Sequence, residues 1–182
     1  MIVLVTGGSG SGKSVYAENL AMKLGNDNLI YIATMMPYDE ECRKRIDRHQ
    51  NSRKDKGFVT IECYTDIRKL MLEGRQTVLL ECMSNLMANE MYSHQGITQL
   101  DKIADVCEEI IDGIKHLASV CKHVIIVTNE VFSDDGHYEE ETKNYIENLG
   151  TINHRIGTLA SNVIEVVCGI PICIRGEIND MD

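Results

Sequence analysis

The sequence predicts an α/β fold in which a mostly parallel β-sheet is covered by helices on both faces. Short apolar runs alternate with longer stretches of helical periodicity, and the glycine-rich segment "GGSGSGKS" at residues 7–14 directly follows the first apolar run. With 182 residues, the chain is long enough for one well-buried core and short for two. We therefore expect a single domain over residues 1–182.

Six apolar runs rich in β-branched residues are the predicted strands. Their lack of strict polar alternation is typical of strands that are covered on both faces. They are "IVLVT" from Ile2, "LIYIA" from Leu29, "FVTIE" from Phe58, "TVLLE" from Thr77, "VIIVT" from Val124 and "VIEVV" from Val163.

Helical patterns occupy the stretches between these runs, at residues 14–24, 38–50, 64–72, 83–92 and 99–121. The clearest is the last, where apolar residues recur at i, i+3 and i+4 and indicate packing against the core. A final helical region over about 138–162 contains Gly150 and Gly157, and a break near Gly150 is expected because glycine weakens a helix.

The composition excludes several classes of protein. A formal net charge of -10 disfavours binding to nucleic acid through a broad basic surface. Seven cysteines without a CxxC pair indicate reduced thiols, and no apolar run approaches the roughly 20 residues that span a bilayer. We expect a cytoplasmic protein with no zinc site and a small-molecule substrate. The histidines at 94, 116, 123, 137 and 154 show no metal-ligand spacing.

The segment from Gly7 to Ser14 satisfies the phosphate-loop pattern G-x-x-x-x-G-K-[ST] between a predicted strand and a predicted helix. Glycines allow backbone N–H groups to turn towards phosphate oxygens, and the helix N-terminus adds positive potential. Lys13 is expected to reach the terminal phosphates, and Ser14 offers a hydroxyl to Mg²⁺. The motif therefore predicts a bound nucleoside triphosphate.

A phosphate loop also needs a carboxylate on a neighbouring strand to hold the metal ion, directly or through water. Glu81 ends the run "TVLLE", which is the position typical of such a carboxylate. Glu130, beside Thr128 and Asn129 after another strand, is a second candidate. Both strand ends are expected at the same edge of the sheet. These features by themselves support only a P-loop phosphotransferase or NTPase.

Two further segments bear on the class of protein. The polar stretch "SDDGHYEEETKN" at 133–144 is interpreted as a solvated loop entering an acidic helix start, with a lid over the substrate as the alternative. Residues 31–53 contain "YIAT", followed by a helix that carries Arg45 and His49. On chemistry alone, a lone helical histidine is more often a surface residue than a catalytic one, and Arg45 suits a surface ion pair as well as a phosphate contact.

Seven motifs, in this order, resemble the bifunctional adenosylcobinamide kinase / adenosylcobinamide-phosphate guanylyltransferase family of cobalamin biosynthesis. The resemblance covers nearly the whole chain, and the arginine-isoleucine-x-x-histidine element after "IAT" is its most specific part. The motifs are the phosphate loop at 7–14, "YIAT" at 31–34, "RIDRH" at 45–49, Glu62 closing "FVTIE", "LLEC" at 79–82, "VTNEV" at 127–131 and "SNVIEVVCGIP" at 161–171.

This resemblance implies a three-layer, RecA-like P-loop fold and two reactions that use GTP or ATP with Mg²⁺. The hydroxyl of the aminopropanol arm of adenosylcobinamide is phosphorylated, and GMP from GTP is then joined to that phosphate to give adenosylcobinamide-GDP. In the family the guanylyl group passes through a phosphoramidate on the histidine that matches His49. The resemblance also implies a homo-oligomer, with a trimer as the expected state.

Carried over residue by residue, His49 and Lys13 are the catalytic residues, and Ser14 and Glu81 hold the metal. Neutral imidazole is a suitable nucleophile near neutral pH because its unperturbed pKa is about 6.5. The implied nucleotide contacts are Gly7, Gly8, Ser9, Gly10, Ser11, Gly12, Lys13, Ser14, Ile32, Ala33, Thr34, Gln50, Asn51, Ser52, Arg53, Glu62 and Glu81.

The chain departs from the family pattern most strongly at residues 132–145, which are acidic and proline-free where members usually have a glycine-rich turn ending in proline. This difference bears on the acceptor end of the reaction more than on the nucleotide end. Two alternatives therefore stay open: a P-loop kinase of a small metabolite without a covalent intermediate, and a GTP-binding regulatory protein.

Overall fold

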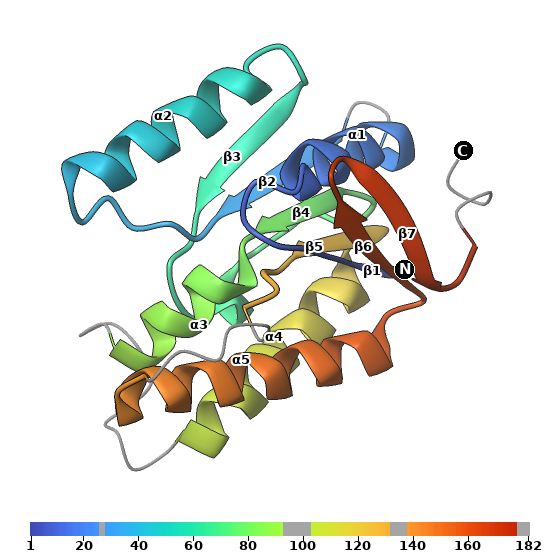
Figure 1. Ribbon diagram of the computed structural model, residues 1–182. Helices are drawn as coiled ribbons and strands as arrows, with labels where there is room; N and C mark the ends of the chain where they lie inside the picture. The colour runs from blue at the N-terminus through green and yellow to red at the C-terminus, as the bar shows by residue number, and fades with distance from the viewer. Residues whose placement is uncertain (26–27, 93–102, 132–137, 178–182) are drawn as a thin grey trace.

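The computed structural model describes residues 1–25, 28–92, 103–131 and 138–177. They form one seven-stranded sheet in the order β3-β2-β4-β5-β1-β6-β7 (Figure 1). The first six strands pair in parallel, and β7 runs antiparallel to β6. The strands are β1 (Ile2–Thr6), β2 (Leu29–Ala33), β3 (Phe58–Glu62), β4 (Thr77–Glu81), β5 (His123–Val127), β6 (Asn162–Val167) and β7 (Ile170–Arg175).

Helices cover the sheet on both sides and confirm the predicted three-layer fold (Figure 1). One side carries α1, and the opposite side carries α3, α4 and α5. A short 3-10 helix, η1, packs against α4. The helices are α1 (Lys13–Gly25), α2 (Glu40–Arg53), η1 (Ile67–Lys69), α3 (Met83–Tyr92), α4 (Ile103–Val120) and α5 (Glu140–Leu159).

Alternation along the central strand β1 divides the core in two. Val3 and Val5 pack with the apolar residues of α1, whereas Leu4 points into the larger cluster formed with α3, α4 and α5. Successive side chains of a strand point to opposite faces, so a strand that is apolar at every position is buried on both sides. This explains why the predicted strands are continuous apolar runs.

The register of the parallel strands aligns their carboxyl ends at one edge of the sheet. Ala33 at the end of β2 pairs with both Glu62 of β3 and Glu81 of β4, and Glu81 also pairs with Val127 of β5. The loop after β1 starts at the same edge, because β1 runs parallel to β5. This edge is where an open α/β sheet binds its ligand.

The predicted helix over 64–72 is wrong, because only Ile67–Lys69 form a single 3-10 turn. Asp66 has a left-handed backbone with φ 48°, and its N–H donates to the buried carboxylate of Glu90. Ile67 is almost fully buried against Gly113 of α4. A tertiary contact of one side chain therefore replaces the helix that the local pattern favours.

The expected break near Gly150 is also wrong, since α5 continues from Glu140 to Leu159. Leu149, Ile152 and Ile156 are fully buried along it. Burying one such side chain stabilises by about 1.5–3 kcal/mol, which exceeds the cost of about 1 kcal/mol for a helical glycine. The packed face therefore decides the helix length.

Strand β7 was not predicted from the sequence. It is joined to β6 by Cys168 and Gly169, which both have positive φ, as a two-residue hairpin turn requires. Asparagine at the first of these positions is the usual signal, and Pro171 within the run disfavours a strand. His94 and His137, together with residues 99–102 of a predicted helix and residues 132–137 of the acidic stretch, lie outside the described residues.

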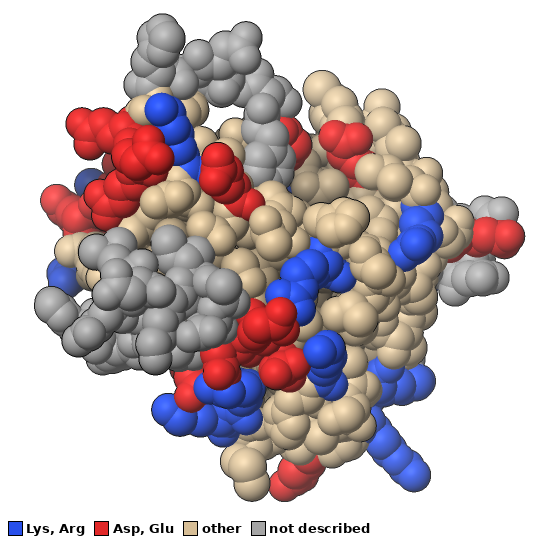
Figure 2. Space-filling model, turned by 90° about the horizontal axis from the view of Figure 1, so that it is seen from below, with Lys and Arg blue, Asp and Glu red and all other residues tan. Residues whose placement is uncertain are grey.

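The outer face of α4 and α5 carries acidic and basic side chains side by side (Figure 2). Arg155 of α5 pairs with Glu108 of α4 at 2.8 Å, and Lys115 pairs with Asp112 at 2.9 Å. Exposed pairs of this kind contribute little to stability. Within the described ranges, none of the helices has the length and apolar character needed to cross a membrane.

Two helical glycines allow a matched test of packing. A Cβ on Gly113 would lie 2.5 Å from Cγ1 of Ile67, whereas one on Gly157 would meet only Leu4 at 3.9 Å. We expect Gly113→Ala to lower the free energy of unfolding by about 1–3 kcal/mol through overpacking, despite alanine's better helix propensity. Gly157→Ala, by contrast, is expected to be neutral or to stabilise by up to about 1 kcal/mol. Urea unfolding followed by circular dichroism measures both, and equal effects would contradict the predicted contact.

Candidate functional site: a phosphate-loop cleft

A cleft of about 940 Å³ opens at the carboxyl edge of the sheet. It lies between the loop after β1, the ends of β2, β3 and β4, and the C-terminal half of α2. Its volume is in the range of cofactor-sized sites. The predicted site residues that line it are Ser9, Gly10, Gly12, Lys13, Ser14, Ala33, His49, Gln50, Ser52, Arg53, Glu62 and Glu81.

The phosphate loop needs its glycines for two reasons. Gly10 and Gly12 have φ of 73° and 92°, a region that other residues rarely adopt. At Gly7, a Cβ would lie 2.5 Å from the carbonyl oxygen of Val166, and Gly169 N–H donates to Ser11 O at 2.8 Å. The loop is therefore held against the β6–β7 turn, which the sequence did not indicate.

Lys13 is the buried cation of the loop, only 8% exposed. Its Nζ donates to the carbonyl oxygen of Gly8 at 3.1 Å. Burial lowers the pKa of Lys13 below its ordinary value and is the largest influence; Arg45 lowers it further, while the nearby Cys82 and Glu81 raise it. Bound phosphate would supply the negative charge that this buried ammonium lacks.

Ser14 and Glu81, the two residues expected to hold a metal ion, contact each other although they are 67 positions apart. Ser14 Oγ donates to Glu81 Oε1 at 2.5 Å. The other carboxylate oxygen, Oε2, is buried and has no hydrogen-bond partner among the described residues. Oxygen donors of this kind are the ligands that Mg²⁺ prefers. Glu130 also lines the cleft, and its N–H donates to Gly7 O at 3.1 Å.

Two residues of the "YIAT" motif are buried and support the structure of the site. Ile32 and Thr34 are both 0% exposed. The Thr34 hydroxyl accepts from the N–H of Cys82 at 2.7 Å and donates to its carbonyl oxygen at 2.9 Å. These bonds join the ends of β2 and β4, so Thr34 fixes the position of Glu81 relative to Ala33.

Helix α2 is a polar helix with a single buried residue, Arg53 in its last turn. Its first turn is capped by Asp39, whose Oδ1 accepts from the N–H of Cys42 at 2.7 Å. At its other end, the guanidinium of Arg53 stacks on the Tyr31 ring, 3.3 Å from the centroid. A cation–π contact of this kind is strongest when desolvated. Polar contacts, and no apolar stripe, therefore hold α2 at the cleft.

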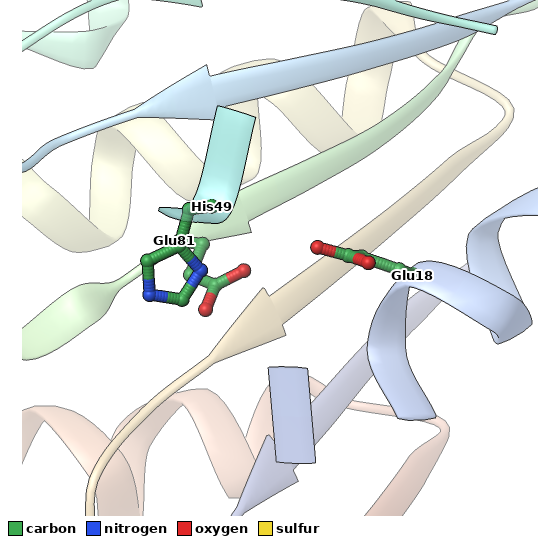
Figure 3. Close-up of side chains that lie close together, drawn as sticks. All are labelled: Glu18, His49 and Glu81. Atoms are coloured by element: carbon green, nitrogen blue, oxygen red, sulfur yellow. The ribbon is translucent and has the colours of Figure 1, made fainter. Parts of the chain in front are cut away.

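His49 projects from α2 into the cleft and is half-buried. Figure 3 shows its imidazole next to Glu81, with the carboxylate of Glu18 facing them from α1. One ligand atom from each of these three side chains lies within 4.8 Å of the other two. The structure therefore brings His49 to the phosphate loop, 35 positions away from Ser14.

The sequence analysis did not identify Glu18, Tyr31 or Tyr64, which all line the cleft. Glu18 follows Ser14 by one helical turn and so lies on the same face of α1, a spacing that could have found it. The side chains of Tyr31 and Ile32 point to opposite faces of β2. The hydroxyl of Tyr64 donates to Glu62 at 2.7 Å, and burial with this bond raises the Tyr64 pKa to about 12. Among the predicted contacts, Gly7, Gly8, Ser11, Ile32, Thr34 and Asn51 do not line the cleft.

The fold and the cleft define a P-loop nucleotide-binding protein. A solved structure, the flagellar accessory protein FlaH from Methanocaldococcus jannaschii, has the same fold, with a TM-score of 0.52 and 15% identity over 97% of this chain and 79% of that one. At this identity the likeness concerns the fold alone. It agrees with the RecA-like arrangement expected above.

The profile of the cobinamide kinase / cobinamide phosphate guanyltransferase family matches residues 3–174, and the chain belongs to this family. Bifunctional adenosylcobalamin biosynthesis proteins named CobU are 30% identical in Escherichia coli K12 and 31% in Salmonella typhimurium, over 96% of this chain and 100% of theirs. The CobP protein of Pseudomonas aeruginosa is 25% identical over 96% of this chain and 97% of its own. The family resemblance expected from the motifs is confirmed.

The lowered pKa of Lys13 gives a pH prediction. Lysine is charged only below its pKa, so nucleotide affinity should be highest at lower pH and should fall as pH rises through a value below the ordinary 10.5. Lys13→Met should weaken binding of a fluorescent GTP analogue about 10- to 100-fold, because a charged hydrogen bond contributes about 1.5–3 kcal/mol. The loss of affinity at alkaline pH should be absent from this variant. The exposed Lys44, which pairs with Glu40, is the control. If the fall in affinity with rising pH persisted in Lys13→Met but disappeared in Lys44→Met, the assignment to Lys13 would be contradicted.

Proposed function

We propose that this protein phosphorylates adenosylcobinamide with a nucleoside triphosphate and then transfers GMP from GTP to the phosphorylated product through a guanylylated His49. The carrying observation is the position of His49, whose imidazole lies beside the phosphate loop and within 4.8 Å of Glu18 and Glu81. Membership in the family supports both activities. GTP serves the second step, and GTP or ATP serves the first.

The kinase step requires only positioning and charge stabilisation. The phosphate loop holds the triphosphate, and Lys13 neutralises the charge that develops on the transferred γ-phosphoryl group and its leaving group. The acceptor is the hydroxyl of the aminopropanol arm, which enters at the side formed by Asn129 and Glu130.

The guanylyl transfer uses the α-phosphorus of a second triphosphate, an intact GTP held at the same phosphate loop. The lone pair of a neutral His49 ring nitrogen forms a bond to phosphorus, and the bond to the departing pyrophosphate breaks. An oxygen of adenosylcobinamide phosphate then displaces the imidazole and forms the new phosphate bond. Covalent catalysis thus divides one difficult displacement into two. The contacts proposed for the nucleotide are the phosphate loop, Ala33, residues 50–53, Glu62 and Glu81.

Ser14 and Glu81 fit a Mg²⁺ ion, because both present oxygen donors and Glu81 Oε2 has no other partner among the described residues. Bound there, the ion would neutralise charge on the phosphate oxygens. A location in the cytoplasm suits these substrates. All seven cysteines are free, as is typical of a reducing compartment.

The covalent step has a direct test. Incubation with GTP labelled at the α-phosphorus should leave acid-labile label on the protein, with a GMP-sized mass increase localised to His49. His49→Ala should lose at least 99% of the label, because no other nucleophile is assigned to this step. The control is His154→Ala, since His154 is an exposed residue of α5 outside the cleft.

Other outcomes separate the alternatives. Persistent label in His49→Ala would exclude the guanylyl-histidine. Transfer of γ-phosphate to adenosylcobinamide by a wild-type protein that never becomes labelled would indicate a kinase without a covalent intermediate. Tight GTP binding with neither transfer would indicate a regulatory protein.

We further propose a homo-oligomer, with a trimer as the expected state, in which the β6–β7 hairpin forms part of the interface. Val167, Ile170 and Ile172 are 43%, 65% and 47% exposed, and the cross-strand pairing places them on one face. Ile174, 60% exposed, extends this apolar edge. Exposed apolar side chains grouped on one face are typical of subunit contacts.

Replacing Ile170 and Ile172 together by glutamate should convert the oligomer to monomer, because two carboxylates would be buried without partners. Light scattering coupled to size-exclusion chromatography measures the mass. The control Met71→Glu changes an apolar residue that is 95% exposed elsewhere. An oligomer of unchanged mass in the double variant would exclude this hairpin from the interface.

A further inference from the structure

Glu18 is a fully buried carboxylate that lies outside the phosphate-loop motif. It is 0% exposed, and it occupies the second turn of α1, directly above Ser14. Glutamate is almost never fully buried unless it is paired, because an isolated charge is costly to desolvate. Its surroundings therefore need an explanation beyond the packing of α1 on the sheet.

The two oxygens of Glu18 have different environments. Oε2 accepts a charged hydrogen bond from Lys56 Nζ at 2.5 Å. Oε1 is 4.0 Å from Arg53 Nη1 and has no hydrogen-bond partner within the described part of the chain, although it is buried. One oxygen is thus engaged by a cation, and the other has a free acceptor position.

Both cations come from the end of the helix that carries His49. Arg53 is the last residue of α2, and Lys56 follows in the turn before β3. Because Arg53 is the only buried residue of α2, this ionic contact is where α2 is fastened to α1. The carboxylate of Glu18 therefore joins the phosphate-loop helix to the helix of the proposed nucleophile.

The carboxylate of Glu18 also faces the imidazole. The carboxylate points from α1 towards His49 and Glu81 (Figure 3), and the nearest ligand atoms of the three lie within 4.8 Å of one another. A shift of at most about 2 Å brings a ring nitrogen into hydrogen-bond range, where donor and acceptor are about 2.7–3.2 Å apart. Such a shift is small for a half-buried side chain on a polar helix.

We propose that Glu18 is a positioning residue for His49, a role that rests on the proposed guanylyl transfer. Its Oε1 accepts the N–H of one ring nitrogen, which directs the lone pair of the other nitrogen at the α-phosphorus. When the N–P bond forms and pyrophosphate leaves, the ring becomes cationic and keeps that proton, and the carboxylate neutralises the charge. When the acceptor phosphate displaces the ring, the imidazole departs neutral with the same N–H.

Glu81 is less suited to this role because its Oε1 already accepts from Ser14 at 2.5 Å and its other oxygen is assigned to the cation of the phosphates. A cation bound by Glu18, His49 and Glu81 together would occupy the lone pair needed for attack. The two carboxylates therefore have different roles: Glu81 binds the cation of the phosphates, and Glu18 accepts a hydrogen bond from the imidazole.

The test measures two rates separately. Formation of labelled enzyme from α-labelled GTP reports the guanylyl step, and ATP with adenosylcobinamide reports the kinase step, which does not use His49. Glu18→Gln should lower the ratio of guanylylation rate to kinase rate about 10- to 100-fold, the scale of a misplaced reacting group. The KM for GTP should change less than threefold. Glu40→Gln, which removes an exposed carboxylate of α2, is the matched control and should leave the ratio unchanged.

A second variant covers the case in which Glu18→Gln does not fold. Glu18→Asp keeps the charge but withdraws it by one methylene, and it should also lower the ratio at least fivefold, with a melting temperature close to that of the wild type. Rates that fall in parallel in the folded variants, or a ratio within twofold of the wild type, would overturn the role of Glu18. If the wild-type protein is active in the kinase assay but is not labelled by α-labelled GTP, the proposed guanylyl transfer fails instead, and the role of Glu18 fails with it.

Discussion

The parallel register of the central strands is the constraint on which the site depends. Ala33 pairs with both Glu62 and Glu81, so the residues that end three neighbouring strands lie side by side at one edge. The loop after β1 begins at the same edge and supplies Lys13 and Ser14. A slip of one residue would turn Glu81 away from Ser14 and move buried side chains to the opposite face of the sheet. The apolar core and the polar cleft are therefore fixed by the same pairing.

Polar and charged contacts, in contrast, hold α2, which forms the remaining wall of the cleft. Helix α2 has no apolar face to bury, and it is fastened at its C-terminal end by the stacking of Arg53 on Tyr31 and by the contacts of Arg53 and Lys56 with Glu18. Buried ion pairs fix geometry more than they add stability, because desolvation offsets much of their attraction. This suits a helix that must hold a side chain beside a triphosphate.

The end of the cleft proposed for the acceptor is built from different elements. Asn129 Nδ2 donates to Ser84 Oγ at 2.7 Å, and the hydroxyl of Tyr145 donates to Ser84 O at 3.1 Å. These bonds connect the end of β5 with α3 and the first half of α5. The acidic segment in which the sequence departs most from its family, residues 132–145, follows β5 in the chain and includes the first residues of α5. The departure therefore concerns the side proposed to receive the corrinoid arm, while Glu62 and Glu81 keep the family pattern.

The sequence by itself determined the six parallel strands, the phosphate loop and the family, because continuous apolar runs and a fixed glycine spacing are local patterns. It also identified Ser14 with Glu81 as partners, since parallel strands end at one edge. It could not find β7, whose turn carries Cys168 in place of the usual residue, or the loss of the helix at 64–72, where one contact of Ile67 outweighs local propensity. Only the tertiary structure placed Glu18 beside His49 and joined Arg53 to Tyr31 and Glu18. Their contacts join segments far apart in the chain, and the free energy of burying charges depends on what each one meets in the folded state.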